Sequence, residues 1–547
     1  MRNSAGFSIV PTVPNVRRAQ ALVLGAVLIV HGRSVAFGFI GLDDQDLLTD
    51  DAAFLRGPVN LLRIFTRSYM HVVDPRHPYY RPLVTASFAL DAHWPGSFPV
   101  ACHATNLLLH ACASLLFLGL LRRFEMGTAA TAGALLFALH PALAAAVAWI
   151  PGRNDSLLAL FVLAAWQFLP FEGFAADSRM RHRLRDAGLL GLHLAFFALA
   201  LLTKETALAT PVVWTLQLAL RPGAASTDRE TSAKRAERAR SPWGWLVAGW
   251  IVLVTARFAL AAAPVPPLGR GEAIVFPSLL LRSLGAVVFP LNPSLLSDAP
   301  DLPLAAGIAA LVLAAAVAAR APGVRPRVVA LGTAAYVVFL LPGLLAGTSL
   351  LLATRLYLPT CGVLLAVTEV LRGLFEGPAT RRAALSFAFV TAGVFALLSL
   401  AYESTFANRR RFARAEVDAA PRCAMAHFCL GASYQMDGDD ARAMTEYRDA
   451  LALGAMEVVH NNVAVIEMGR GDWASAEGDL REEIAVSPGY ARAYRNLAVV
   501  LRHESRAADA ADADARAAAL EAITSGPPPP TRRSAPTTGE RARDPAQ

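Results

Sequence analysis

Apolar residues along the chain gather into long runs that are separated by short polar segments. At least eight stretches are long and apolar enough to be membrane spans; they include 19–40, 107–121, 188–202, 245–263, 304–319, 328–345 and 385–400. A helix of about 20 predominantly apolar residues crosses the hydrocarbon core of a bilayer. The pattern therefore predicts an all-α, polytopic membrane protein.

Composition and charge agree with this prediction. The chain has 547 residues, of which 55% are hydrophobic and only 17% are charged. Its net charge of +8 comes largely from short loops between the apolar runs, as is typical of cytoplasmic loops, so we expect membrane lipid and no nucleic acid as a partner. The five cysteines show no CxxC and no metal-like spacing with histidine, and we assign them no site.

The cationic loops also predict a topology. They lie at 17–18, 122–123, 179–185, 221–240, 320–327 and 372–382. Placing them all in the cytoplasm turns the loops 43–100, 140–155, 203–206, 264–300 and 347–356 outward, provided that the proline-containing segment 273–297 returns without crossing. The prediction is then about 11 spans, with the N-terminus inside and the C-terminal domain outside. Arg409, Arg410 and Arg411 conflict with it, since they follow the last span on the outer side; if 273–297 crosses, the C-terminus is cytoplasmic.

From about residue 418 the hydropathy drops and a repeat of about 34 residues begins. Gly438 and Gly471 correspond, as do Ala443 and Ala476, and a weaker third copy starts near Tyr490. The period and the small residues resemble tetratricopeptide repeats over 418–521, an α-solenoid that usually binds extended peptide. A repeat domain that only docks on its own membrane part is the alternative. The Pro- and charge-rich segment 522–547 is predicted to be disordered.

The stretch "FGFIGLDDQDLLTDD" places several carboxylates directly after the first apolar run, and it opens the longest outward loop, 43–100. Residues 49–65 predict an amphipathic helix that Asp50 and Asp51 cap and whose apolar residues lie on the bilayer surface: Phe54, Leu55, Leu61, Leu62 and Phe65. Capping does not explain Asp43 and Asp44, which precede that helix at the membrane boundary.

Other outward turns carry cations at span ends. The candidates for binding the donor phosphate are Arg81, Arg153, Lys204 and Arg355, and the other substrate-site candidates are His140, Asp155, Glu205 and Tyr357. Arg and Lys stabilise phosphate, whereas each of these residues alone is equally compatible with snorkelling at the headgroup level. A carboxylate can remove the proton of an acceptor hydroxyl, and cations opposite it can stabilise a departing phosphate.

Several motifs occur in an order that resembles a known family: "YRPLVTASFALD", "HATNLLLHA", "LLFALHPALAAAVAWIPGRNDSLLAL", "LLTKETAL" and "RLYLPTCG". Together with the C-terminal repeats, they are similar to the transmembrane and tetratricopeptide-repeat O-mannosyltransferases, which have the GT-C glycosyltransferase fold. The resemblance covers most of residues 20–520. It implies transfer of a sugar, typically mannose, from a polyprenyl phosphate to Ser or Thr of an exported polypeptide. It also carries the family's acidic pair over to Asp43 and Asp44, one of them as catalytic base.

One departure from the family is Ala145, which stands where an acid is expected. Its loss bears on metal binding or acceptor contact, so a divalent cation cofactor remains open and no cofactor is assigned. We expect a bacterial relative in the cytoplasmic membrane, with the active site and repeats on the outer, periplasmic face. The expected parts are a cytoplasmic segment 1–18, a GT-C-like domain 19–405, the repeats and the tail.

Two other functions stay open at this point. The first is a catalytically silent membrane scaffold that gathers partners on its repeats. The second is a transporter of lipid-linked sugar, which predicts polar residues within spans and broken helices. His31 and Arg33 inside the first apolar run are the sequence feature that points to the transporter.

Overall fold

The computed structural model describes residues 16–57, 60–70, 79–169, 180–220, 242–260, 270–291, 294–296, 304–345, 353–454 and 457–525. Every regular element in these ranges is helical, which confirms the predicted all-α class. The chain divides into two compact units, the first made of residues 1–72 and 76–459, the second of 73–75 and 460–547. The predicted cationic block 221–240 and most of the predicted tail lie outside the described residues.

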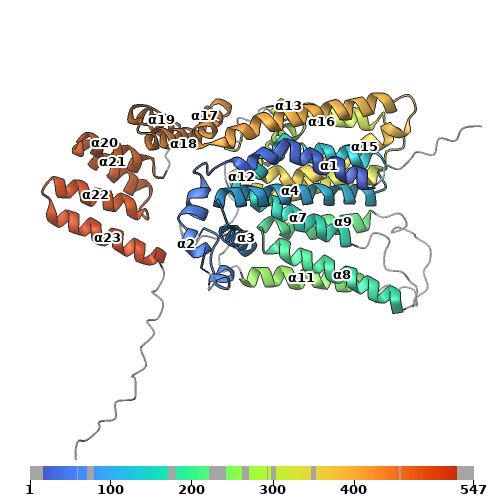
Figure 1. Cartoon of the computed structure of the whole chain (residues 1–547), viewed down its shortest axis with the longest axis horizontal. Helices are drawn as coiled ribbons and strands as arrows, with labels where there is room; N and C mark the ends of the chain where they lie inside the picture. Colours follow the sequence, from blue (N-terminus) through green and yellow to red (C-terminus); the bar gives the residue numbers. More distant parts are fainter. Residues whose placement is uncertain are drawn as a thin grey trace, which may run out of the picture. The chain divides into compact units, whose positions relative to one another are not determined.

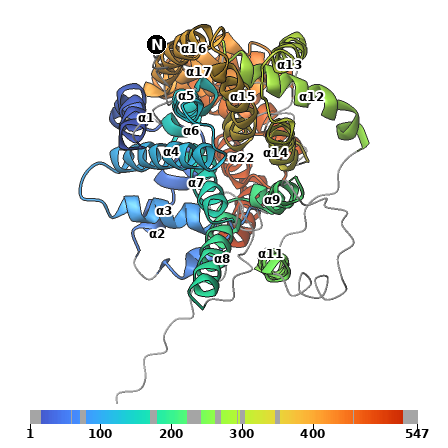
Figure 2. The same ribbon diagram turned by 90° about the vertical axis from the view of Figure 1, so that its right-hand side faces the viewer.

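Long helices run side by side through the first unit (Figures 1 and 2). They are α1 Val16–His31, α4 Phe98–Arg123, α5 Ala129–Ala138, α6 Pro141–Ala148, α7 Arg153–Phe168, α8 Met180–Leu201, α9 Thr210–Ala219, α11 Pro242–Leu260, α12 Arg270–Val288, α13 Leu304–Ala318, α14 Pro326–Leu345, α15 Tyr357–Glu376 and α16 Arg381–Glu403. Two further helices, α2 Ala52–Leu55 and α3 Pro82–Ala92, lie at one end of this bundle (Figure 1).

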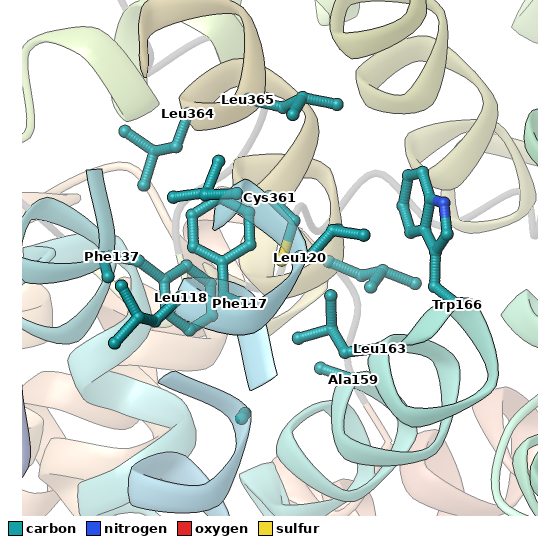
Figure 3. Close-up of a cluster of buried hydrophobic side chains, with 14 of the residues drawn as sticks. Phe117, Leu118, Leu120, Phe137, Ala159, Leu163, Trp166, Cys361, Leu364 and Leu365 are labelled. Atoms are coloured by element: carbon teal, nitrogen blue, oxygen red, sulfur yellow. The ribbon is translucent and has the colours of Figure 1, made fainter. Parts of the chain in front are cut away.

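The centre of the bundle is an apolar cluster between α4, α5, α7 and α15. Figure 3 shows side chains from these helices interleaved, among them Phe117, Phe137 and Trp166. The ring centroids of Phe117 and Phe137 are 4.9 Å apart, and all three side chains are at most 1% exposed. Dispersion contacts of this density fix the mutual positions of the four helices, and therefore of the loops at their ends.

Five helices among the described residues are long and apolar enough to cross a membrane: Val16–Ala36, Phe98–Arg123, Pro326–Gly343, Thr354–Glu376 and Arg381–Ala407. The bent pair Ala129–Ala138 and Pro141–Ala148 makes a sixth if it counts as one span, and four further apolar helices are shorter. These helices confirm a membrane protein, whereas the predicted 11 spans and the return of 273–297 stay predictions.

Basic residues of several predicted cytoplasmic loops meet at one end of the bundle. Arg325 and Arg372 both bond to the buried carboxylate of Glu369, with shortest distances of 2.6 Å. Arg325 also donates to the carbonyl of Phe124 at the end of α4, and Arg123 donates to the carbonyl of Leu169 after α7. The loops after α4 and α7, the start of α14 and the end of α15 therefore lie together, as the topology predicts.

The span formed by α5 and α6 is broken by a bend of 51°. Pro141 has no N–H, and the N–H of Ala142 donates to Nδ1 of His140 at 3.2 Å. The carbonyl of Ala138 therefore loses the partner that a continuous helix would give it. An open carbonyl in an apolar layer costs several kcal/mol, so a broken span needs donors from its neighbours.

Three side chains from other helices supply those donors. Nε2 of His31 on α1 and Nε2 of His110 on α4 donate to the Ala138 carbonyl, at 2.9 and 3.1 Å. The hydroxyl of Ser399 on α16 donates to the Leu139 carbonyl at 2.9 Å. Nδ1 of His31 pairs with the buried carboxylate of Glu403 on α16. We call His31, His110, His140, Ser399 and Glu403 the break network.

The predicted amphipathic helix over 49–65 is not continuous. A π-helical turn at Gln45–Thr49, the four-residue α2 and a 3₁₀ turn at Arg63–Thr66 take its place. In the sequence, Gly57 and Pro58 fall in the middle of the predicted helix, and a glycine followed by a proline disfavours a continuous helix. The predicted helix is therefore wrong as a single element.

Its side chains divide between two environments. Asp51 precedes α2 without a side-chain cap, and the Asp50 carboxylate accepts a bond from Nε2 of Gln45 at 2.6 Å. Leu55 is buried in a core with Phe88 and Ile150, while Leu62 is 83% exposed. Leu61, Leu62 and Phe65 are exposed, so they can still lie on the bilayer surface as predicted. Leu55 is buried and cannot.

The repeat region forms helix pairs: α18 Ala424–Met436 with α19 Asp440–Leu453, α20 Val459–Arg470 with α21 Trp473–Val486, and α22 Ala491–His503 with α23 Ala507–Ser525. Gly438 and Gly471 both turn at a φ of +78°, and the Asp that follows each glycine caps the next helix. The first pair belongs to the first compact unit, together with α17 Arg409–Ala419, and the two later pairs fall in the second. The assignment to tetratricopeptide repeats stays a prediction.

Candidate functional site

Residues 40–46, which follow α1 and a 3₁₀ turn at Gly32–Ala36, form a tight turn that we call the acidic turn. The backbone N–H of Ile40 donates to Oδ2 of Asp44 at 2.7 Å, and Gly41 adopts a φ of +82°. Asp44 is 1% exposed, whereas Asp43 is partly exposed. Asp44 therefore closes the turn from inside, and Asp43 is the carboxylate that a substrate can reach.

Burial raises the pKa of both carboxyl groups. The pKa of Asp43 rises to about 6, because burial and the neighbouring Asp46 outweigh the favourable charge of Arg81. The pKa of Asp44 rises to about 7, because burial outweighs its bond from the Ile40 N–H. Near pH 7 Asp43 is therefore largely ionised and can accept a proton.

Arg81, directly before α3, pairs with Glu205 after α8. The shortest distance between Nη2 of Arg81 and the Glu205 carboxylate is 3.0 Å, and the Arg81 guanidinium lies over the ring of Tyr79, 4.3 Å from its centroid. Arg257 in the last turn of α11 approaches the same carboxylate at 3.7 Å. Burial alone would raise the pKa of Glu205, but the Arg81 charge lowers it, so Glu205 is ionised and shared by two arginines.

Lys204 and Asp155 form a second pair beside the first. Nζ of Lys204 lies 2.7 and 2.8 Å from the two carboxylate oxygens of Asp155, at the start of α7. Arg355, before α15, interacts electrostatically with Asp155, Arg81 and Glu205, and its Nη1 donates to the carbonyl of Gly343. The predicted residues Arg81, Asp155, Lys204, Glu205 and Arg355 thus meet at one end of the bundle; with Arg257 we call them the cation cluster.

Tyr69 and Arg81 connect the cation cluster to the acidic turn. Arg81 interacts electrostatically with Asp43, and its guanidinium lies 5.2 Å from the ring centroid of Tyr69. The Tyr69 hydroxyl is bonded by the Asn154 side chain at 3.3 Å, next to Asp155. Asp43 therefore lies within electrostatic reach of the cation cluster, as the sequence predicts for a base opposite a phosphate.

The cation cluster has more positive than negative charge. Its four cations are Arg81, Lys204, Arg257 and Arg355, and its two acids are Asp155 and Glu205, which leaves an excess of two positive charges among these residues. Partly buried cations in excess attract a multiply charged anion such as a phosphate. The partial exposure of Glu205, whose side chain is 33% accessible, leaves the cluster open to a ligand.

Arg153 does not fit its predicted role in donor binding. It is completely buried, and Nε donates to Asn106 at 2.8 Å while Nη1 donates to Ser87 at 3.1 Å. Nη2 donates to the Cys102 carbonyl at 2.7 Å and pairs with Asp91 at 2.6 Å. With partners at all three nitrogens, Arg153 braces the start of α7, and we reassign it from phosphate binding to positioning Asp155.

His140 and Tyr357 also have internal roles instead of the predicted substrate contacts. His140 is the N-cap of α6, and its ring centroid lies 4.6 Å from that of Phe395. The Tyr357 hydroxyl bonds to Nδ1 of His110 at 2.6 Å, and Tyr357 is 0% exposed. Ala145 is fully buried in α6, so this chain has no carboxylate where the family resemblance implies an acid.

Sequence reasoning missed Arg257 and Tyr69. Arg257 lies inside a predicted span, where its donors bind the carbonyls of Leu201 (2.9 Å) and Tyr80 (3.0 Å). A single cation near the outer end of an apolar run was the available signal. Tyr69 carried no such signal, because a tyrosine in an interfacial loop is ordinary.

Among the described residues, one group of three side chains has the spacing to hold a metal ion: His427, Glu446 and Asp449 on the first repeat. Nδ1 of His427 lies 2.8 Å from Glu446, and its other nitrogen bonds to the Pro421 carbonyl. His460 and Asp479 form the same interhelical contact 33 residues later, at 2.6 Å. The recurrence indicates a packing contact of the repeat, and we assign it no metal.

Comparison with known proteins identifies relatives, although no family model matches the chain. Over 153 residues the chain is 33% identical to the human protein O-mannosyl-transferase TMTC1, covering 27% of this chain and 17% of the relative. It is 35% identical over 176 residues to Tmtc1 of Drosophila melanogaster, covering 31% and 19%, and 30% identical over 211 residues to human TMTC4, covering 34% and 27%. The matched part is thus less than a third of each relative's own length.

A solved structure, ArnT from Cupriavidus metallidurans bound to undecaprenyl phosphate, is similar with a TM-score of 0.40 and 16% identity, covering 86% of this chain and 80% of that one. The sequence matches confirm the resemblance that the motifs predict. Over about a quarter to a third of its length, the chain is similar to proteins named protein O-mannosyl-transferases.

Proposed function

We propose that the protein is a membrane glycosyltransferase that moves a sugar, expected to be mannose, from a polyprenyl-phosphate donor to Ser or Thr hydroxyls of an exported polypeptide. The observation that carries this proposal is the placement of Asp43 within electrostatic reach of a cation cluster with excess positive charge. The relatives, which are named protein O-mannosyl-transferases, support the reaction class.

In this mechanism the acceptor hydroxyl oxygen attacks the anomeric carbon of the donor sugar. The bond between that carbon and the phosphate oxygen breaks, and its electron pair leaves with the polyprenyl phosphate. Asp43 takes the hydroxyl proton, since it is the more exposed member of the acidic pair and is largely ionised near pH 7. Arg81, Lys204 and Arg355 stabilise the charge that develops on the phosphate.

Lys204 and Arg81 are held by Asp155 and Glu205 when no donor is bound. These acids keep the cations in place and lower the cost of burying them. A donor phosphate then adds a third anion to a cluster whose four cations and two acids leave two excess positive charges, so it need not displace either acid. Arg257 shares Glu205 with Arg81 and completes the same electrostatic field.

The proposed site lies at the end of the bundle opposite the basic loops of Arg123, Arg325 and Arg372. By the positive-inside rule those basic loops are cytoplasmic, so the site faces outward. For a bacterial cytoplasmic membrane this is the periplasmic face, where exported polypeptide is available. The repeats would hold the polypeptide, and the GT-C arrangement remains a prediction.

A transporter of lipid-linked sugar is less well supported. The features that favoured it were His31 and Arg33 within the first apolar run, together with a broken helix. The break network explains His31 and the broken helix, and Arg33 is exposed and lies 3.9 Å from Glu403 of that network. His31 satisfies a carbonyl that the break opens, so neither His31 nor the broken helix requires a transport path.

The test is sugar transfer by the purified full chain from polyprenyl-phosphate sugars to an acceptor peptide. Replacing Asp43 by Asn should lower transfer by about 10²- to 10⁴-fold, the range for removal of a general base. Asp44→Asn should also lose transfer, because the turn that presents Asp43 is opened. Thermal unfolding checks that each variant is folded.

Asp50→Asn is the matched control, since Asp50 is exposed in the next turn and, within the described part of the chain, its side chain bonds only to Gln45. It should transfer sugar within twofold of the unchanged protein. If the folded, unchanged protein transfers no sugar from any polyprenyl-phosphate donor, the proposal fails and the scaffold function is favoured. Movement of lipid-linked sugar that survives Asp43→Asn would favour the transporter.

A further inference from the structure

The three arginines after the last apolar run, which conflict with the predicted topology, have specific contacts in the fold. Nε of Arg409 donates to the carbonyl of Ile40 at 3.3 Å. Arg410 pairs with Asp437 and lies over the ring of Tyr434, 5.8 Å from its centroid. Two of these arginines therefore connect α17 to other parts of the first unit, and their presence here need not mark a cytoplasmic loop.

Arg409 packs directly on the acidic turn. A Cβ placed on Gly41 would lie 2.2 Å from Nε of Arg409, and Gly41 already has a φ of +82°. The Ile40 peptide is thus bound on both sides: its N–H donates to Asp44 at 2.7 Å, and its carbonyl accepts from Arg409. Arg409 also interacts electrostatically with Asp44. The turn that presents Asp43 is therefore held by two side chains: Asp44, which is part of the turn, and Arg409, which comes from α17.

A second contact anchors α17 near its C-terminal end. Glu416, which is 1% exposed, accepts bonds from the backbone N–H groups of Leu295 (3.0 Å) and Leu296 (2.8 Å) and from the hydroxyl of Ser294 (2.6 Å). Three donors on one carboxylate hold the segment 294–296 against the helix. Because α17 is fixed at Glu416, the position of Arg409 two turns earlier is fixed as well.

The first repeat lies against the same place. Cys429 on α18 is buried and interacts electrostatically with Asp43, Arg409 and Glu416. The Arg409 guanidinium also contacts the sulfur of Met436 at the end of α18. The acidic turn, α17 and the first repeat belong to one compact unit, which ends at Val459.

We propose that Arg409 is a positioning residue that locks the acidic turn to α17 and the first repeat, so that this repeat is a structural part of the catalytic site. This inference rests on the proposed function for its kinetic consequence and on geometry alone for the lock. It separates the first repeat from the two later pairs: the first holds the base in place, whereas the later ones are free to serve acceptor binding.

The experiment compares Arg409→Ala with Arg414→Ala in the full-length protein. Arg414 lies on the same helix and its side chain is 61% exposed. Within the described part of the chain, it pairs only with Asp418, at 3.6 Å. Hydrogen exchange of the peptide covering residues 37–46 should become at least about tenfold faster in Arg409→Ala, equivalent to losing one charged hydrogen bond, and stay unchanged in Arg414→Ala. Equal exchange in all three proteins would overturn the lock.

Kinetics supply a readout that general destabilisation would not give. In Arg409→Ala the kcat of sugar transfer should fall about 10- to 100-fold while the donor KM stays within twofold, because the cation cluster is untouched. Arg409→Lys keeps the charge and should recover part of kcat. An unchanged kcat, or a loss carried entirely by the donor KM, contradicts the proposal. Faster exchange in a protein that transfers no sugar would refute the proposed function and keep the lock.

A double variant guards against misfolding of a single one. Gly41→Ala alone should speed exchange of the same peptide, because its Cβ would overlap the Arg409 guanidinium and its φ disfavours alanine. If Arg409 is the group that fills this space, Gly41→Ala should cost less in the Arg409→Ala background. If the increase in exchange rate of the double variant equals the product of the increases in the two single variants, the two residues do not interact, and the inference is overturned.

Discussion

The break network and the cation cluster are both groups of polar side chains in the apolar bundle, yet they differ in burial and in the balance of charge. In the break network, the carbonyls of Ala138 and Leu139 receive donors from three helices, and His31 and Glu403 are each 0% exposed. In the cation cluster, four cations share two acids, and Glu205 is one third exposed. Polar side chains that are fully buried and bonded to one another have a structural role. A cluster with excess positive charge and access to solvent is suited to bind an anionic ligand.

The same rule sorts residues that the sequence grouped together. Arg153 and Lys204 both lie in loops that are predicted to face outward. Arg153 has four internal partners and no exposure, whereas Lys204 pairs with Asp155 and interacts electrostatically with Arg81 and Arg355. Burial of Lys204 lowers its pKa, and Asp155 opposes that shift. Lys204 therefore gains most from a second anion nearby, which a donor phosphate would provide.

The largest effect should come from opening the closed network. Glu403→Ala leaves His31 without its carboxylate partner in the interior, which should cost about 3–5 kcal/mol of folding free energy. Glu205→Ala, in the partly exposed cluster, should cost about 1 kcal/mol or less. Thermal and denaturant unfolding of both variants in the same detergent compare the two regions. Equal losses would mean that exposure does not distinguish them.

A smaller effect should separate a ligand-binding arginine from a bracing one. Arg355→Ala should lower kcat/KM for the donor by about 10- to 100-fold, as for a lost bond to a charged group, with less change in acceptor use. Arg153→Lys should leave the donor KM unchanged and lower thermal stability, because lysine cannot reach Asn106, Ser87 and Cys102 together. A raised donor KM in Arg153→Lys would return that residue to the binding site.

The smallest effect should be on the pH dependence of transfer. Asp43 must be ionised to accept a proton, and its pKa is about 6, so kcat/KM should fall about tenfold per pH unit below pH 6 and level off above it. Arg81 lowers this pKa, so Arg81→Gln should move the acid limb to higher pH by less than about one unit. A limb that moves to lower pH in Arg81→Gln would exclude Asp43 as the base.

Much of the architecture could be predicted from the sequence, because apolar runs partition into the lipid and basic loops stay in water whatever their tertiary partners are. The sequence predicts the spans around α1, α4, α14 and α16, the meeting of Arg325 with the α4 end, and the 33-residue spacing of Gly438 and Gly471. The convergence of Arg81, Lys204 and Arg355 also followed, since outward turns of one bundle must share a face.

The roles of single polar residues did not follow, because they depend on partners far apart in the sequence. Arg153 binds Asp91 and Asn106, and Tyr357 binds His110, 247 residues away. No local pattern distinguishes such a brace from a ligand. The prediction of one helix over 49–65 was wrong. The spacing of its apolar residues is that of an amphipathic helix, but the Gly57-Pro58 pair in the sequence disfavours a continuous one.

The break in the α5–α6 span has a consequence for biosynthesis. The carbonyl of Leu139 gains its donor from Ser399, which the ribosome adds 260 residues later, and His31 gains its partner Glu403 only 372 residues later. Until the last membrane helix emerges, the amino-terminal half of the bundle holds an unfinished span in the lipid. Chains that stall before this helix should therefore be recognised and degraded by quality control instead of persisting as shortened products.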